Sequence, residues 1–131
     1  VMNGAVMTNF ARPDAPFASA RVGDGDPFVS EVDESDGSIA LYRPHVAVLN
    51  NVSRDHKEMD ELRQLFGDFL RRARHCAVNV DDAEARALAP GHSVTFGLRA
   101  GARLRATDLA PRPDGIGFTL NGMAVSLAVP G

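Results

Sequence analysis

Residues 27–38 read PFVSEVDESDGS, an apolar run that leads directly into a cluster of acids. The continuous apolar character of Phe28–Val32 predicts a central parallel strand that is buried on both faces. Carboxylates gathered this closely repel one another unless a cation or hydrogen-bond donors neutralise them. A solvated acidic loop is the alternative, because runs of charge usually face water. The acids are Glu31, Asp33, Glu34 and Asp36.

A second apolar run, HVAVLN at His45–Asn50, predicts another buried strand of the same kind. Glu58–Arg72 predicts a helix, because its apolar residues recur at steps of three and four while acids lead and arginines close it. The elements expected around these two are a short strand at Ala18–Val22, a helical or irregular link at Ile39–Arg43, a strand at His75–Val80, and a short helix through Leu88 that Asp81 or Asp82 caps.

From Ser93 onward the apolar residues alternate with polar ones, which is typical of half-buried antiparallel strands. Asn121-Gly122 is a strong hairpin signal between two such runs. The chain therefore predicts an α/β, Rossmann-like domain, with a mostly parallel sheet, flanking helices and a small antiparallel sheet in the C-terminal third. The expected late strands are Val94–Phe96, Ala102–Leu109, Gly115–Leu120 and Met123–Val129.

The composition is that of an ordinary soluble domain, with 131 residues, 44% of them hydrophobic, and a net charge of −3. This charge gives no general attraction to nucleic acid or to an anionic membrane, and we expect neither as a partner. No apolar run is long enough to cross a bilayer. Cys76 is the only cysteine, which excludes an internal disulfide and favours a cytoplasmic location.

Three polar sets follow the predicted strands: 31–36, 51–56, and Asn79 with Asp81 and Asp82. If the strands are parallel neighbours, these sets meet at the sheet edge where ligands bind. The acids would supply oxygen ligands for a divalent cation and His56 a nitrogen ligand, which indicates metal and phosphate chemistry. However, the sequence contains no G-x-x-x-x-G-K-[ST] phosphate loop.

The stretches PFVSEVDESDGS, VAVLNNVSRDH, AVNVDDAEARALAP and SVTFGL, in this order, resemble the central domain of the Mur ligases. The resemblance covers most of the chain. It is best to the branch that adds L-alanine and to the related branch that recycles murein tripeptide. It implies a cytoplasmic, ATP- and Mg²⁺-dependent ligase of peptidoglycan synthesis, and so a role in cell shape and division. The implied substrates are a UDP-N-acetylmuramate-type sugar nucleotide and an amino acid.

The resemblance also implies roles for individual residues. Glu31 and His56 correspond to the magnesium-binding and catalytic pair, and Asn79 to the asparagine that contacts adenine. Asn51 joins Asn79 among the cofactor-binding residues. The residues expected near the substrate carboxylate are Ser35, Asp36 and Ser38. The implied reaction is attack of a carboxylate on the γ-phosphate, followed by attack of an amine on the acyl-phosphate.

In the family a phosphate loop precedes the stretch that resembles the start of this chain. We therefore expect residues 1–131 to be a central ATP-binding domain truncated at both ends, inactive alone, with N- and C-terminal domains as partners. Asn50-Asn51 favours the recycling branch, whereas Ser35 and Gly37-Ser38 favour the L-alanine branch. Several Mur ligases use a carbamylated lysine on the helix that corresponds to Glu58–Arg72. This helix contains no lysine, which is consistent with the L-alanine branch. A ligase for a different amine and a non-catalytic module remain alternatives.

Overall fold

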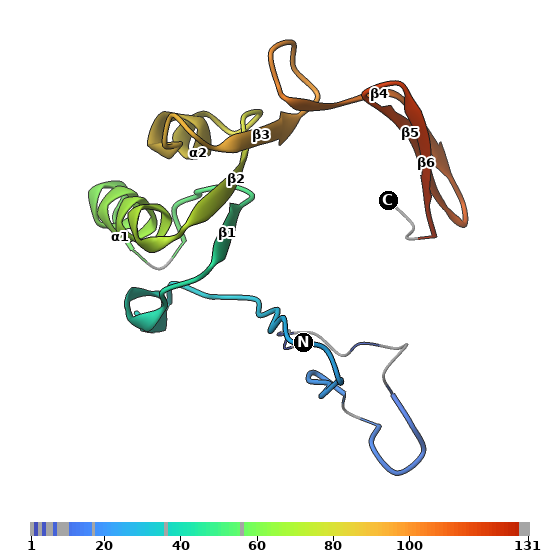
Figure 1. The fold of residues 1–131 in the computed structure, drawn as a ribbon, viewed down its shortest axis with the longest axis horizontal. Coiled ribbons are helices and arrows are strands. Elements are labelled where there is room, and N and C mark those ends of the chain that lie inside the picture. The colour runs from blue at the N-terminus through green and yellow to red at the C-terminus, as the bar shows by residue number, and fades with distance from the viewer. Residues whose placement is uncertain are drawn as a thin grey trace. The chain divides into compact units, whose positions relative to one another are not determined.

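The computed structural model describes Met2, Gly4, Met7 and residues 11–16, 18–35, 37–55 and 57–128. The chain divides into two compact parts, residues 1–38 and 39–131. Figure 1 labels the regular elements, which are η1 (Ser38–Leu41), β1 (Val46–Leu49), α1 (Met59–Arg72), β2 (His75–Asn79), α2 (Ala83–Leu88), β3 (Val94–Gly97), β4 (Leu104–Arg112), β5 (Gly115–Leu120) and β6 (Met123–Leu127).

The strands hydrogen-bond in chain order, from β1 to β6. β1, β2 and β3 are parallel, with Ala47 beside Cys76 and Ala77 beside Val94. β4 is also parallel to β3, whereas β4, β5 and β6 pair antiparallel. The α/β fold class is therefore confirmed, including the change to antiparallel strands in the C-terminal third.

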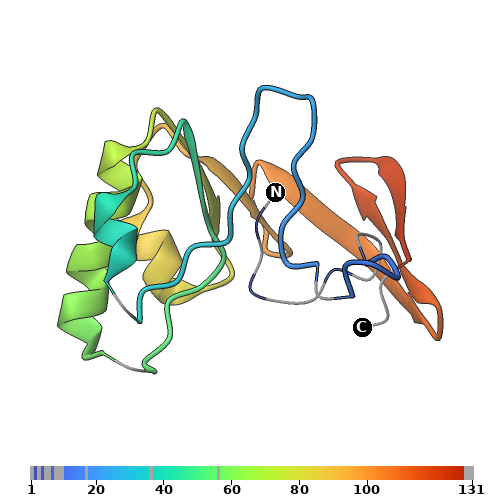
Figure 2. The same ribbon diagram turned by 90° about the horizontal axis from the view of Figure 1, so that it is seen from below.

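Both helices lie on the same face of β1–β3 (Figures 1 and 2). α1 buries Leu62, Phe69 and Leu70, which its periodic pattern places on one side. Asp60 and Glu61 in its first turn favour the helix because the N-terminus carries partial positive charge, while arginines occupy the last turn. The predicted helix is confirmed, and it begins one residue later than expected.

β1 is buried on one face only, which corrects the prediction of a strand buried on both. Ala47 and Leu49 face the helices and are 0% and 4% exposed. Val46 and Val48 alternate with them and are 52% and 56% exposed. The sequence run is apolar on both sides, but within the described residues helices cover only one side of these strands.

The predicted strands at 28–32 and 18–22 are wrong. Ser30 and Ala20 each form one isolated bridge, both with Met2, and neither segment is a regular strand. Phe28 is 72% exposed and Val29 is 59% exposed. A central parallel strand needs a partner on each side and helices over both faces. Within the described residues, 28–32 has only its two backbone bonds with Met2.

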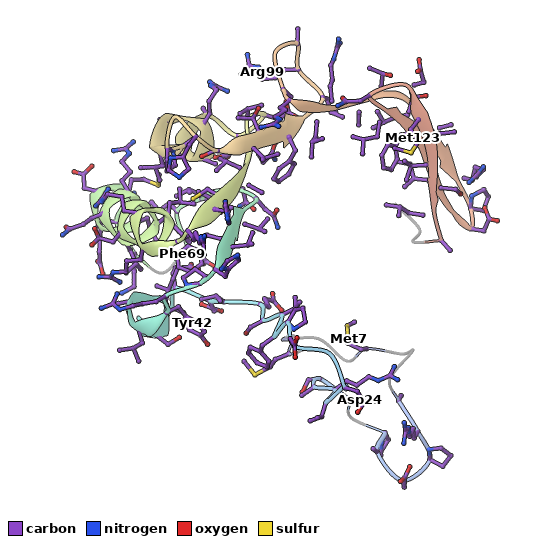
Figure 3. The ribbon with its side chains drawn as sticks, in the orientation of Figure 1. Met7, Asp24, Tyr42, Phe69, Arg99 and Met123 are labelled. Atoms are coloured by element: carbon purple, nitrogen blue, oxygen red, sulfur yellow. The ribbon has the colours of Figure 1, made fainter. Side chains whose placement is uncertain are left out.

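The C-terminal strands match the alternating pattern closely. β5 has the predicted bounds, and the turn at Asn121-Gly122 has positive φ at both residues, 48° and 86°, as a two-residue hairpin favours. β4 begins and ends later than predicted, with an irregularity between Thr107 and Ala110. Met123 begins β6 on an exposed surface (Figure 3). Val129 lies outside the described residues.

Candidate functional site

The carboxyl ends of β1, β2 and β3 lie at one edge of the sheet. Leu49 is beside Val78 and Asn79 is beside Phe96, in parallel register. Ligands of open α/β sheets bind at this edge. Three polar sets were predicted to meet at this edge, and the parallel pairing of β1 with β2 confirms this for the residues directly after Leu49 and for Asn79 at the end of β2. The set at 31–36 does not follow a strand, because residues 28–32 do not form one.

Asn79, the predicted adenine contact, ends β2 in a half-buried position. Its Oδ1 accepts a hydrogen bond of 3.0 Å from the backbone N–H of Asp81. Because a backbone N–H can only donate, the side-chain atom that faces it must be the oxygen. The Nδ2 amide is consequently oriented away from this bond, as a donor.

Asp82 connects the start of α2 with the loop after β1. Its Oδ1 caps α2 by accepting from Ala85 N at 2.7 Å, and it also accepts from Val52 N at 3.4 Å. Val52 is 4% exposed, so this loop is packed into the core rather than free. Asn51, beside it, is exposed and donates from Nδ2 to Ser53 Oγ at 3.4 Å.

Asp81, which was predicted as a possible helix cap and as part of the polar set at this edge, hydrogen-bonds to the loop after β3. Its carboxylate accepts from Leu98 N at 2.6 Å and from Arg99 N at 3.1 Å. Arg99, labelled in Figure 3, also donates from Nη1 to the carbonyl of Val80 at 3.4 Å. The sequence signal that could have found this contact is Gly97, which ends β3 where the carboxylate approaches.

Glu31, the predicted magnesium ligand, has an exposed carboxylate in residues 1–38. Its Oε2 accepts from Gly4 N at 2.7 Å, and a Cβ on Gly4 would lie 3.2 Å from this oxygen. Asp33 accepts from Ser35 N at 2.6 Å, which shapes the turn that follows. Backbone donors thus neutralise part of the acidic cluster. Carboxylate oxygens are ligands that Mg²⁺ prefers, so Glu31 suits the ion.

Two predicted site residues, His56 and Asp36, lie outside the described residues, and Ser38 begins η1. Over the described ranges, no group of three or more His, Cys, Asp or Glu side chains could hold a metal ion. Glu31 and Ser35 belong to residues 1–38, while Asn51 and Asn79 belong to residues 39–131. The magnesium site therefore stays a prediction, as does the substrate role of Ser35, Asp36 and Ser38.

Comparison with known proteins gives a consistent result. The chain is 34% identical over 133 aligned residues, 89% of its length, to UDP-N-acetylmuramate–L-alanine ligase of Xanthomonas oryzae pv. oryzae (strain PXO99A). The same enzyme of Xanthomonas campestris pv. campestris (strain B100) and that of Xanthomonas axonopodis pv. citri (strain 306) match at the same identity and coverage. The resemblance to the Mur ligases is confirmed. No protein-family model matches the chain.

The chain spans 28% of the length of these Mur ligases. The similarity therefore concerns one region of them. No helix among the described residues is long and apolar enough to cross a membrane.

Proposed function

We propose that the chain is the central, ATP-binding region of a cytoplasmic Mur-type ligase that joins L-alanine to UDP-N-acetylmuramate. The observation that carries this proposal is the 34% identity to ligases of that name over 89% of the chain. The fold supports it, because Asn79 ends β2 and Asn51 lies shortly after β1, at the edge where parallel α/β sheets bind nucleotides.

In the proposed reaction the substrate carboxylate attacks the γ-phosphorus of ATP and ADP leaves. The amine of alanine then attacks the acyl carbon, inorganic phosphate leaves, and the amine loses a proton. Asn79 and Asn51 would position the nucleotide, and Ser35, Asp36 and Ser38 the carboxylate. Glu31 and His56 would hold Mg²⁺, which screens the like charges of carboxylate and phosphate.

The proposal includes domains beyond this region, because the relatives are much longer. The sugar nucleotide would bind mainly to an N-terminal domain and the amine partly to a C-terminal one. Residues 1–131 contain no G-x-x-x-x-G-K-[ST] loop. Such a loop normally supplies most of the contacts to the phosphates. We therefore expect residues 1–131 alone to bind Mg²⁺–ATP weakly and to show no turnover.

The test measures ADP release by the natural gene product that carries the chain. We expect release that requires ATP, Mg²⁺, UDP-N-acetylmuramate and L-alanine together. Release that depends on a murein tripeptide in place of alanine would instead assign the recycling reaction. Absence of release with either amine would favour a non-catalytic module. Saturable micromolar binding of ATP to residues 1–131 would contradict the expected need for a phosphate loop.

A further inference from the structure

The carboxylate of Asp81 closes a clasp between the end of β2 and the loop after β3. Its two oxygens accept from two successive backbone N–H groups, those of Leu98 and Arg99. Charge-assisted bonds of this kind are stronger than neutral ones. The guanidinium of Arg99 adds a bond to the Val80 carbonyl, and Val80 N donates to Phe96 O at 2.9 Å. The two segments are therefore joined by four hydrogen bonds.

Gly97 allows the clasp to close. A Cβ at this position would lie 2.8 Å from Asp81 Oδ2 and 2.9 Å from Oδ1. Its φ of 153° is also one that other residues rarely adopt. Any side chain at residue 97 would push the carboxylate out of place, so Gly97 and Asp81 form one structural unit.

The same turn orients Asn79. The backbone N–H of Asp81 holds Asn79 Oδ1 at 3.0 Å, while the side chain of Asp81 holds the neighbouring loop. Fixing the turn through its side chain fixes the direction of its backbone donor. With Oδ1 held in this way, Nδ2 is the donor that the Asn79 amide offers to a ligand. Ring nitrogens of a purine are acceptors, so a donor here is complementary to them.

We propose that Asp81 is a positioning residue of the nucleotide site, which acts through the clasp to fix the amide of Asn79 toward the base. This inference rests on the proposed function. It assigns to Asn79 a donor role toward a ring nitrogen and to Gly97 a role in closing the clasp. Both assignments concern the affinity for the nucleotide, not the chemical steps.

The test uses Asp81→Ala and Gly97→Ala in the natural gene product, which break the clasp from opposite sides. The loss that ATP would register is the hydrogen bond from a misoriented Asn79 amide to the base, which is worth about tenfold in affinity. We expect the KM for ATP to rise about tenfold in each variant, with kcat changed less than about twofold. Asn79→Asp keeps the accepting oxygen but replaces the donor by a second acceptor, and should also raise the KM.

The matched control is Glu84→Ala, which removes the ion pair with Arg63 of α1 and none of the four hydrogen bonds of the clasp. It should lower the melting temperature without changing the KM for ATP. Amide hydrogen exchange of Leu98 and Arg99 provides a readout that needs no activity, and it should be faster in Asp81→Ala.

Three outcomes are distinguishable. A raised KM for ATP in the clasp variants, with the control unchanged, supports the positioning role. ATP-dependent ligation by the wild type with an unaltered KM in the clasp variants overturns this role and leaves the proposed function intact. A wild type that neither binds nor consumes ATP overturns the proposed function, and the inference fails with it.

Discussion

Arg63 on α1 and Glu84 on α2 form a two-bond ion pair, with Nε to Oε2 at 2.8 Å and Nη2 to Oε1 at 2.7 Å. Arg63 also donates to Asp60 within α1. Paired guanidinium–carboxylate bonds fix orientation as well as distance. The pair therefore links the two helices that lie over the sheet.

The ion pair predicts a pH-dependent stability. Hydrogen bonding from Arg63 lowers the pKa of the Glu84 carboxyl. Because the folded pKa lies below the unfolded value of roughly 4.3, the pair stabilises the fold above that value and this contribution is lost as pH falls through the folded pKa. At neutral pH, we expect the wild type to unfold at a higher urea concentration than Glu84→Gln. In acid, the two midpoints should become equal.

Asp114→Asn is the matched control for this titration, since Asp114 lies 3.9 Å from Arg112 Nε and both are exposed. It should change the midpoint little at any pH. A difference between wild type and Glu84→Gln that stayed constant into acid would show that the effect is not electrostatic.

Creating a cavity in the core beneath α1 should reduce the stability of the fold strongly. Leu62 is 0% exposed, so Leu62→Ala should lower the free energy of unfolding by about 2–5 kcal/mol. Leu41 is 83% exposed, and the same substitution there should change it by less than about 0.5 kcal/mol. Chemical denaturation monitored by circular dichroism measures both. Equal costs at the two sites would contradict the burial described for α1.

The two helix N-caps predict different sensitivities. Asp82 accepts from Ala85 N, whereas Glu58, the N-cap of α1, makes no side-chain capping bond. Asp82→Ala should lower the free energy of unfolding by about 0.5–2 kcal/mol, and the amide hydrogens of α2 should exchange faster. Glu58→Ala should leave the exchange of α1 nearly unchanged. A larger effect at Glu58 than at Asp82 would be inconsistent with the observed caps.

Glu31→Gln in the natural gene product tests the proposed magnesium ligand. The amide oxygen can still accept from Gly4 N, so the local shape is kept while the charge is lost. The Mg²⁺ concentration that half-saturates ligation should rise by roughly tenfold or more. That is the effect of mutating a residue that only hydrogen-bonds to a metal ligand, and Glu31 is proposed as a ligand itself. Glu34→Gln removes a neighbouring charge and should have a smaller effect. Equal Mg²⁺ requirements in the two variants would contradict the proposal that Glu31 binds the ion.

Local signals account for the elements that the sequence predicted well. The periodic apolar face of Glu58–Arg72 and the Asn121-Gly122 turn each depend on residues close in sequence, and both are present in the structure. Asp82 as the cap of α2 follows from the same kind of signal.

The failures concern properties that depend on distant segments. The run at Phe28–Val32 has the composition of a buried strand, but strand formation depends on partners that the run itself does not specify. The Asp81 clasp joins residues 17 and 18 positions apart, and a carboxylate gives no sign of which backbone donors will approach it. The acids and His56 were predicted as metal ligands from the residue types at the strand ends, whereas the choice of Glu31 among the acids and the adenine contact of Asn79 came from family resemblance; these roles stay predictions.

The order of the strands has a consequence for folding. β4, β5 and β6 are joined by short turns, whereas β1 pairs with β2 only after the chain has returned through α1. Contacts between distant residues form more slowly because closing the intervening loop costs entropy. We expect the C-terminal hairpin to form before the parallel strands during refolding. Pulsed hydrogen exchange should therefore protect amides of β5 and β6 earlier than those of β1, and simultaneous protection would contradict this order.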